Sequence, residues 1–132
     1  MIVDVVPRAR VRRNVLPDGE VDRHVGGSVG GWGEDLRSYI DESWRGRGAS
    51  TASQTAWALL ALLAAGEAHG PVTRRGIDWL TSTQQADGSW DEPWYTGTGF
   101  PWDFSINYHL YRLVFPLMAL GRYQRSLEAS RP

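Results

Sequence analysis

The chain has 132 residues, of which 42% are hydrophobic and 22% are charged, a composition that fits one globular domain and excludes wholesale disorder. Fourteen basic residues, all of them arginine, stand against fifteen acidic ones, and the resulting net charge of −1 argues against a nucleic-acid-binding module. Cysteine is absent, which excludes disulfides, thiolate metal sites and cysteine nucleophiles.

No stretch of the sequence predicts a membrane-spanning helix. The longest apolar run, residues 56–65, is far shorter than the roughly 20 residues that a spanning helix needs. The first residues lack the apolar segment of a signal peptide. We therefore expect a cytoplasmic chain, and attachment to the inner face of the membrane stays open as an alternative.

The first 66 residues divide into an arm, a loop and a helix. Residues 1–25 show no sustained period and predict an irregular arm, whereas the glycine-rich stretch 26–48 predicts a loop. A helix is predicted within 48–66, because Ser50 or Thr51 suits its N-cap and a glycine at 66 suits its end. Its apolar residues cover nearly the whole circumference, which is typical of a helix buried on most sides.

The rest of the chain predicts further helices. Residues 71–85 form one, with Pro71 in the first turn and an Asp-Gly stop at 87–88. A loop rich in tryptophan, glycine and proline is predicted from 90 to 101. The last helical region, 104–125, should break before Pro116, which cannot donate a backbone N–H, so two helices are expected there.

A repeat is visible within the sequence. The pattern Gly-x-Trp-x-Glu occurs at 30–34 and again at 88–92, an offset of 58 residues (30 to 88). The same offset places the Leu-Leu-Ala-Leu stretch 59–62 on the Leu-Met-Ala-Leu stretch 117–120 without a gap. The repeating unit is thus a Gly-x-Trp turn, a loop and a buried helix. Such units stack, because one unit cannot bury its own apolar face.

One segment carries a family resemblance. Residues 75–90 read R-G-x-x-W-L-x-x-x-Q-x-x-D-G-S-W and resemble the QW repeat of triterpene cyclases. The stretches GGWGED, STASQTAWALLAL, DEPWYTGTGFPWDF and YRLVFPLMALGRY are similar to the C-terminal end of bacterial squalene-hopene cyclases. The resemblance implies an all-α fold, a partial α/α toroid of about four helices with Gly/Trp-rich loops. Residues 26–125 would form the C-terminal part of such a toroid, 1–25 a non-homologous or irregular arm, and 126–132 a tail.

The resemblance also assigns structural roles to the repeat. We expect Gln84 to bond the free backbone groups of a neighbouring helix end, and Trp90 to cover that junction with its apolar face. Gly88 belongs to the same structural element. Gly30 and Trp32 are its counterparts in the first copy.

The candidate cavity residues are aromatic. Phe104, Tyr108 and Tyr111 are spaced i, i+4 and i+7, which predicts one face of a helix. By resemblance, Phe100 and these three residues line the substrate cavity, where ring faces stabilise carbocations. The competing interpretation, that the tyrosines only pack in the core, stays open.

The sequence lacks a proton donor. The acid of this family lies in an Asp-x-Asp-Asp motif, which this sequence does not contain, so we assign no catalytic residue. The acidic pairs at 34–35 and 91–92 are expected to cap helices or pair with arginines. The three histidines lack metal-ligand spacing, and neither a metal nor another cofactor is expected.

Three interpretations follow. The first is a C-terminal fragment of a squalene-hopene cyclase, an enzyme that converts squalene to hopanoid triterpenes by a carbocation cascade; alone, the chain should be inactive. The others are a non-catalytic toroid-repeat protein that binds a complementary chain, and an independent binder of an apolar ligand. Two repeat units cannot close a toroid, so an apolar face, for instance on helix 56–65, should stay exposed. That face would favour self-association, an upstream cyclase chain, a squalene-like substrate or a membrane surface as partner, and no nucleic acid is expected.

Overall fold

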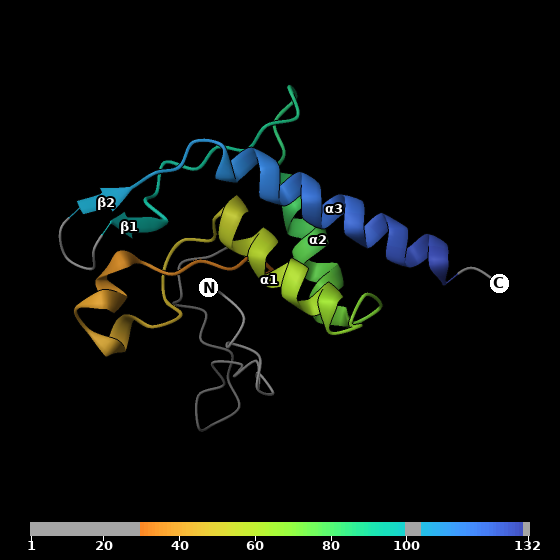
Figure 1. Cartoon of the computed structure of the whole chain (residues 1–132), viewed down its shortest axis with the longest axis horizontal. Helices are drawn as coiled ribbons and strands as arrows, with labels where there is room; N and C mark the ends of the chain where they lie inside the picture. Colours follow the sequence, from red (N-terminus) through yellow and green to blue (C-terminus); the bar gives the residue numbers. More distant parts are fainter. Residues whose placement is uncertain (1–29, 100–103, 131–132) are drawn as a thin grey trace.

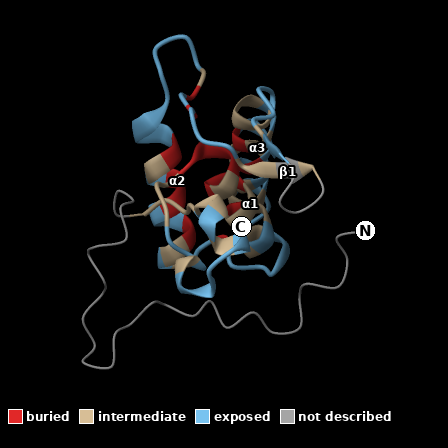
Figure 2. Ribbon diagram, turned by 90° about the vertical axis from the view of Figure 1, so that its left-hand side faces the viewer, coloured by how far each residue is buried: buried red, intermediate tan, exposed pale blue. Residues whose placement is uncertain are grey.

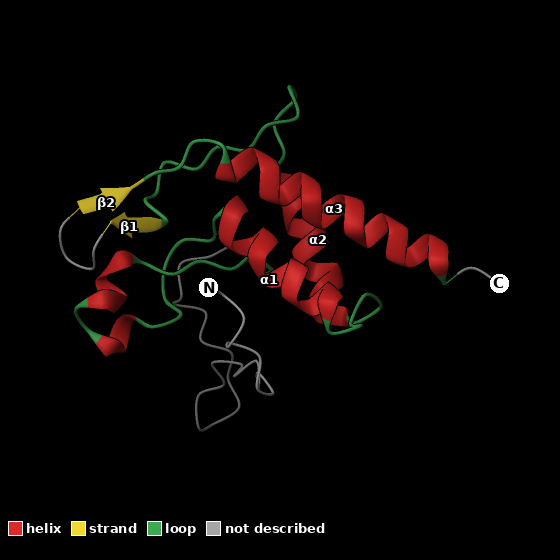
Figure 3. Cartoon of the chain, viewed as in Figure 1, coloured by secondary structure: helices red, strands yellow, loops and turns green. Residues whose placement is uncertain are grey.

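The structure is a computed structural model that describes residues 30–99 and 104–130 (Figure 1). Its described part consists of three α-helices, two short 3-10 helices and a two-stranded sheet (Figure 3). In chain order the elements are η1 (Leu36–Tyr39), η2 (Glu42–Trp44), α1 (Ala52–Ala64), α2 (Pro71–Thr83), β1 (Gly97–Gly99), β2 (Phe104–Ile106) and α3 (Tyr111–Ala129). The predicted arm, residues 1–25, lies outside the described residues. The dominance of helix confirms the all-α prediction.

Helix α1 lies at the centre, because it packs against both α2 and α3. The hydroxyl oxygen of Thr51 accepts a hydrogen bond from the backbone N–H of Gln54, so the predicted N-cap is Thr51. Gly66, with φ of +82°, supplies the left-handed residue expected after the helix. The buried core is a small cluster where the three helices meet (Figure 2). Its buried members are Ala52, Ala56, Leu59, Ile77, Leu80, Trp90 and Ala119.

Helix α2 begins at Pro71, as predicted, and ends two residues before the expected position. Its Ile77 and Leu80 face the core. Gly76 allows α1 to come close, because a Cβ atom there would lie 2.6 Å from the ring of Trp32 and 2.9 Å from a methyl group of Leu59. A larger side chain at this position would push the two helices apart.

Helix α3 contradicts the prediction of a break at Pro116. The helix runs without interruption from Tyr111 to Ala129 and contains this proline in its second turn. The proline removes one backbone hydrogen bond, but its ring is buried together with Ala119 on the side of α3 that packs against α1. Burial of the ring offsets the lost bond. The described part therefore has three α-helices, not about four, and the helix extends past residue 125 into the predicted tail.

The segment before α3 also differs from the prediction. Residues 104–110 are not helical: Phe104–Ile106 pairs antiparallel with Gly97–Gly99, and Gly97 stands opposite Ile106 in this short hairpin. The expected helical face of Phe104, Tyr108 and Tyr111 therefore does not exist. Among the described residues, no helix is both long and apolar enough to cross a membrane.

The loop predicted for residues 26–48 holds the two 3-10 helices. Asp35 caps η1 by accepting a hydrogen bond from the backbone N–H of Arg37, and Asp41 caps η2 in the same way. The Arg37 guanidinium lies 3.3 Å from the centre of the Trp44 ring, which ties the two turns together. The segment that holds η1 and η2 lies beside the hairpin, at one end of the helices (Figure 1).

Candidate functional site

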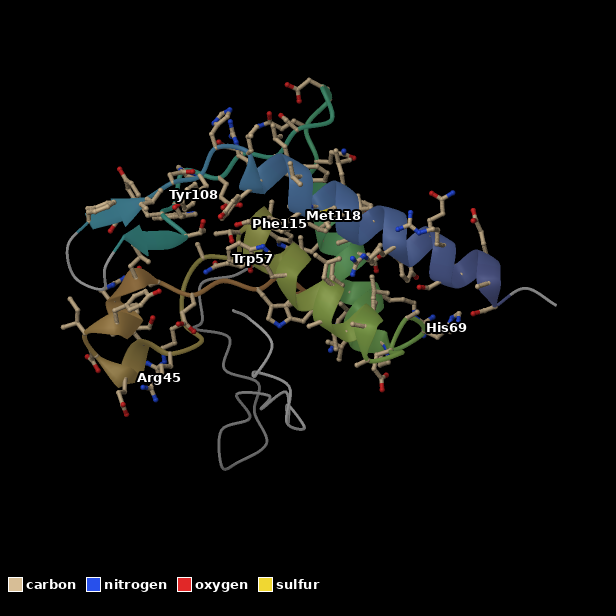
Figure 4. The ribbon with its side chains drawn as sticks, viewed as in Figure 1. Arg45, Trp57, His69, Tyr108, Phe115 and Met118 are labelled. Carbon is tan, nitrogen blue, oxygen red and sulfur yellow. The ribbon has the colours of Figure 1, made fainter. Side chains whose placement is uncertain are left out.

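Four aromatic rings form a continuous cluster where α1 meets the start of α3 (Figure 4). Trp57 of α1 meets Tyr111 edge to face at 5.9 Å and Phe115 at 5.5 Å between ring centres. Tyr111 and Phe115 contact each other at 5.1 Å, and Tyr108 stacks on Tyr111 at 4.6 Å. These distances and angles are the favourable ones for aromatic pairs, so the rings hold one another in place.

The hairpin extends this aromatic surface. Tyr108 lies over Gly97, where an added Cβ would stand 3.2 Å from its ring. Phe104 lies over Gly99, its partner in the sheet, and an added Cβ would clash with its ring. The glycines therefore leave room for the rings. Phe104 is 56% exposed, so its ring is available to a neighbour or a ligand.

The structure brings together only part of the predicted site. Tyr108 and Tyr111 are in contact, Phe104 lies on the hairpin over Gly99, and Phe100 lies outside the described residues. Trp57 and Phe115 belong to the cluster but were not predicted for it. The signals were present: Trp57 sits on the apolar circumference of α1, and Phe115 follows Tyr111 by four residues on α3.

A buried carboxylate holds the loop after α2 against the N-terminus of α1. Both oxygens of Glu92 accept hydrogen bonds from Ser53, from its backbone N–H at 2.8 Å and from its hydroxyl at 2.6 Å. Both residues are buried. Since a helix N-terminus carries a partial positive charge, it stabilises this carboxylate without a cation. The acidic residue thus serves as the expected helix cap.

The same loop is also tied to α3. The side chain of Arg112 donates to the backbone carbonyl of Trp90 at 3.0 Å and lies 3.7 Å from the carboxylate of Asp91. The Asn107 amide donates to the carbonyl of Glu92 at 3.2 Å. Residues 90–92 therefore connect the N-terminus of α1 with the start of α3. This connection positions the two helices that carry the aromatic cluster.

The second Gly-x-Trp turn is locked by its own residues. The Trp90 indole N–H donates to the carbonyl of Leu80 at 2.8 Å, which satisfies a free group in the last turn of α2. Gln84 differs from the expectation: its amide donates at 2.9 Å to the carbonyl of Gly88 in the same turn, not to a neighbouring helix end. Gly88 has a φ of +86°, which favours glycine. Gln84 thus closes the turn, and Trp90 joins it to the helix.

The first Gly-x-Trp turn is also attached to a helix, but through the backbone of its tryptophan and not through the indole. The backbone N–H of Trp32 donates to the hydroxyl of Thr55 at 2.9 Å, and its carbonyl accepts from the backbone N–H of Thr51. Gly30 has a φ of +123°. Trp32 is only half buried and packs against the core. Both turns therefore end on the first turns of α1, one at 51–55 through Trp32 and the other at Ser53 through Glu92.

The remaining acidic residues are occupied in local structure. Hydrogen bonds from the Arg37 side chain and backbone N–H hold the pKa of Asp35 below its ordinary value. Hydrogen bonds from Ser89 lower the pKa of Asp87 in the same way. Glu34 accepts from Ser38 and from the N–H of residue 46. Within the described part, no three histidine or carboxylate side chains are arranged to hold a metal ion. Of the two acidic pairs, Asp35 and Glu92 serve as the expected caps and Asp91 pairs with an arginine, whereas Glu34 only accepts hydrogen bonds within its own loop.

The chemistry that this surface offers is that of ring faces. An aromatic face attracts a cation without forming a bond to it. The exposed rings are those of Phe104 and Tyr108, whereas Trp57, Tyr111 and Phe115 are half-buried and support them. The described part of the chain thus combines glycine-tryptophan turns, packed helices and an aromatic surface.

Comparisons with known proteins assign this chain to the terpenoid cyclase class, which has the α/α toroid fold. The family model for the squalene-hopene cyclase C-terminal domain matches residues 21–125, and the chain belongs to this family. A squalene-hopene cyclase of Alicyclobacillus acidocaldarius is 61% identical over 96 residues, which are 73% of this chain and 15% of that protein. A squalene-hopene cyclase of Bradyrhizobium diazoefficiens is 55% identical, over 72% of this chain and 14% of that protein.

A third relative carries a different name. Dammaradiene synthase of the organism Dryopteris crassirhizoma is 50% identical over 77% of this chain and 16% of that protein. The chain thus spans only about 15% of the length of the relatives that it matches.

Proposed function

We propose that this chain forms part of the cavity wall of a squalene-hopene cyclase, which converts squalene to hopanoid triterpenes by a carbocation cascade. The observation that carries the proposal is the aromatic cluster of Trp57, Tyr108, Tyr111 and Phe115. Its rings would stabilise cations that form as the substrate cyclises. The hairpin ring of Phe104 would extend this wall toward the substrate.

The proton that starts the reaction comes from outside this chain in our proposal. Protonating an alkene needs a strong acid, and the sequence contains no Asp-x-Asp-Asp motif. The buried carboxylate, Glu92, is bound to Ser53 and caps α1. The chain therefore works only together with the rest of a cyclase, which would supply the acid and close the cavity around an apolar substrate.

The first experiment tests the chain alone. Purified protein is incubated with squalene in detergent, and the products are analysed by gas chromatography against a boiled control. We expect no hopene, because the acid is missing. Hopene above the control would contradict the proposal that the proton donor lies elsewhere.

The second experiment tests whether the aromatic residues line the substrate cavity. The chain is combined with the Alicyclobacillus cyclase from which the 96 matching residues have been removed. Once activity is restored, Phe104→Ala should release early-terminated, partly cyclised products, because a cation loses one of its stabilising faces. The matched control is Tyr39→Ala, an aromatic residue of η1 with similar exposure, 47%.

The outcome separates two roles of Phe104. A changed product profile with an unchanged melting temperature supports a role in the cavity wall. An unchanged profile at reduced yield would make this residue a packing residue. If the chain alone binds squalene tightly while the combined proteins stay inactive, the protein is an independent binder of apolar ligands and the proposal is wrong.

A further inference from the structure

Helix α3 carries apolar side chains on two opposite sides. Pro116 and Ala119 are buried, on the side that packs toward α1. The opposite side carries an apolar stripe that consists of four residues, each between 41% and 64% exposed. They are Leu110, which is the N-cap residue of α3 and has a helical backbone conformation, and Val114, Leu117 and Met118 within the helix. Their spacing of i, i+4, i+7 and i+8 places them on one face of the helix. Residues 113–120 are all apolar, and a helical segment that is apolar all round is typically covered all round.

The apolar stripe has a definite length and end. It continues from residue 110 to Gly121, about 16 Å along the helix axis. On the same face, the exposed residues that follow are Gln124, Arg125 and Glu128, and all three are polar. The sequence predicts an exposed apolar face on helix 56–65. However, α1 contributes no large exposed hydrophobic residue, and its Leu59 is fully buried. The apolar face that lacks a cover therefore belongs to α3.

Gly121 is a second, independent sign of a neighbour. It lies within α3 on the same face as the stripe, although glycine is unfavourable inside a helix. Nothing in the described structure requires its small size, since an added Cβ would meet only a side-chain nitrogen of Arg125 at 4.0 Å. The helical glycine of α2 shows the contrast, because Gly76 lies directly against Trp32 and Leu59. A glycine on an otherwise apolar exposed face suits the close approach of another helix.

The internal repeat indicates what kind of neighbour this is. The offset of 58 residues places Leu117 on Leu59 (117 to 59). Leu59 is 0% exposed, because α2 packs over it with Gly76 at the contact, whereas Leu117 is 59% exposed. Thus α1 packs against both α2 and α3, whereas α1 is the only helix of the described part with which α3 makes extensive contacts. In the first copy of the repeat, the neighbour at this position is an α-helix.

We propose that the apolar stripe of α3 is the docking surface for one amphipathic α-helix of another polypeptide, packed on α3 as α2 packs on α1. The helix comes from the part of a cyclase that this chain does not contain, so this inference rests on the proposed function. The stripe supplies the apolar contact. Gly121 supplies the point of closest approach, where the axes of two helices can come nearer than bulky side chains permit.

The test measures binding of the chain to the Alicyclobacillus cyclase that lacks its 96 matching residues. We expect a 1:1 complex by light scattering. Leu117→Asp places a charge in the apolar contact and Gly121→Leu fills the point of approach, and each should weaken binding by about tenfold or more. The matched controls are Ile40→Asp and Ala129→Leu. Ile40 is 77% exposed and directly follows η1, and Ala129 is exposed at the end of α3. Neither should change binding.

Several outcomes would overturn the inference. Because Leu117 is 59% exposed and an added Cβ at Gly121 would meet only a side-chain nitrogen of Arg125, the melting temperature of the isolated chain should change little, and a large drop would assign these residues to its own packing. If neither variant changes the affinity, the apolar stripe is excluded as the docking surface. If both variants instead abolish a dimer of the chain, or its flotation with phospholipid vesicles, the occupant is a second copy or a membrane. A stripe-dependent complex without squalene conversion would refute the proposed function and leave the docking surface intact.

Discussion

The carboxylate of Glu92 should contribute more to stability than any other acidic group of the described structure. It accepts two hydrogen bonds from buried Ser53 and stands at the N-terminus of α1. Glu92→Ala removes both bonds and leaves the hydroxyl and the N–H of Ser53 unsatisfied. The backbone carbonyl of residue 92, which accepts from Asn107, is unaffected, so the loop keeps its tie to the segment before α3.

The expected loss can be estimated from these contacts. A hydrogen bond to a charged group is worth about 1.5–3 kcal/mol, and an anion at a helix N-terminus adds roughly 0.3–1 kcal/mol. Because the terms overlap, we expect Glu92→Ala to lower the free energy of unfolding by about 3–4 kcal/mol. Glu92→Gln keeps the shape and loses the charge, so roughly 1–2 kcal/mol should be lost. The total stability of a domain is only about 5–15 kcal/mol.

The assay is urea unfolding followed by circular dichroism at two protein concentrations, which separates unfolding from association. The matched control is Asp91→Asn. Asp91 is adjacent, 73% exposed and paired with Arg112 at 3.7 Å, so its loss should cost below about 0.5 kcal/mol. If Glu92→Ala and Asp91→Asn cost the same, the buried cap does not stabilise α1 as argued. A double-mutant cycle with Ser53→Ala would show the coupling directly.

Two further predictions concern other contacts. Gly76→Ala should lower the free energy of unfolding by about 1–3 kcal/mol, because its Cβ would overlap Trp32 and Leu59; an unchanged urea midpoint would show that α2 shifts freely on α1. Hydrogen bonds from Arg37 lower the pKa of Asp35 from its ordinary 3.8, so the stability that this carboxylate contributes is present above pH 3.8 and is lost as the pH falls through the lowered value. Asp35→Asn should therefore lose less stability than the unchanged protein between about pH 5 and pH 2.5, as measured by thermal melts, and equal losses would contradict this assignment.

Local signals in the sequence predict α1 and α2 well. Thr51 and Gly66 bound α1, and Pro71 begins α2, because caps and first-turn residues act on the backbone next to them. The prediction of a break in α3 is wrong because the continuity of this helix depends on tertiary contacts. Pro116 stays inside the helix since its ring is buried, and this burial is invisible in the local pattern.

The candidate site was predictable only in part, for a related reason. Tyr108 and Tyr111 were expected near each other and do stack, although through a turn and a helix start and not through one helical face. Trp57 comes from a different helix, and only the packing of α1 on α3 brings it to the cluster. The pairing of Glu92 with Ser53 joins residues 39 positions apart, which spacing rules do not reach.

The cap of α1 has a consequence for the order in which the chain is built. Synthesis proceeds from the N-terminus, so α1 and α2 are complete before Glu92 is added. A nascent chain halted between Thr83 and Glu92 would contain both helices while Ser53 still lacked its partner. The first Gly-x-Trp turn, by contrast, precedes α1 and can bind it at once through Trp32. The helical pair therefore becomes fully bonded only when the ribosome has finished the loop that follows α2.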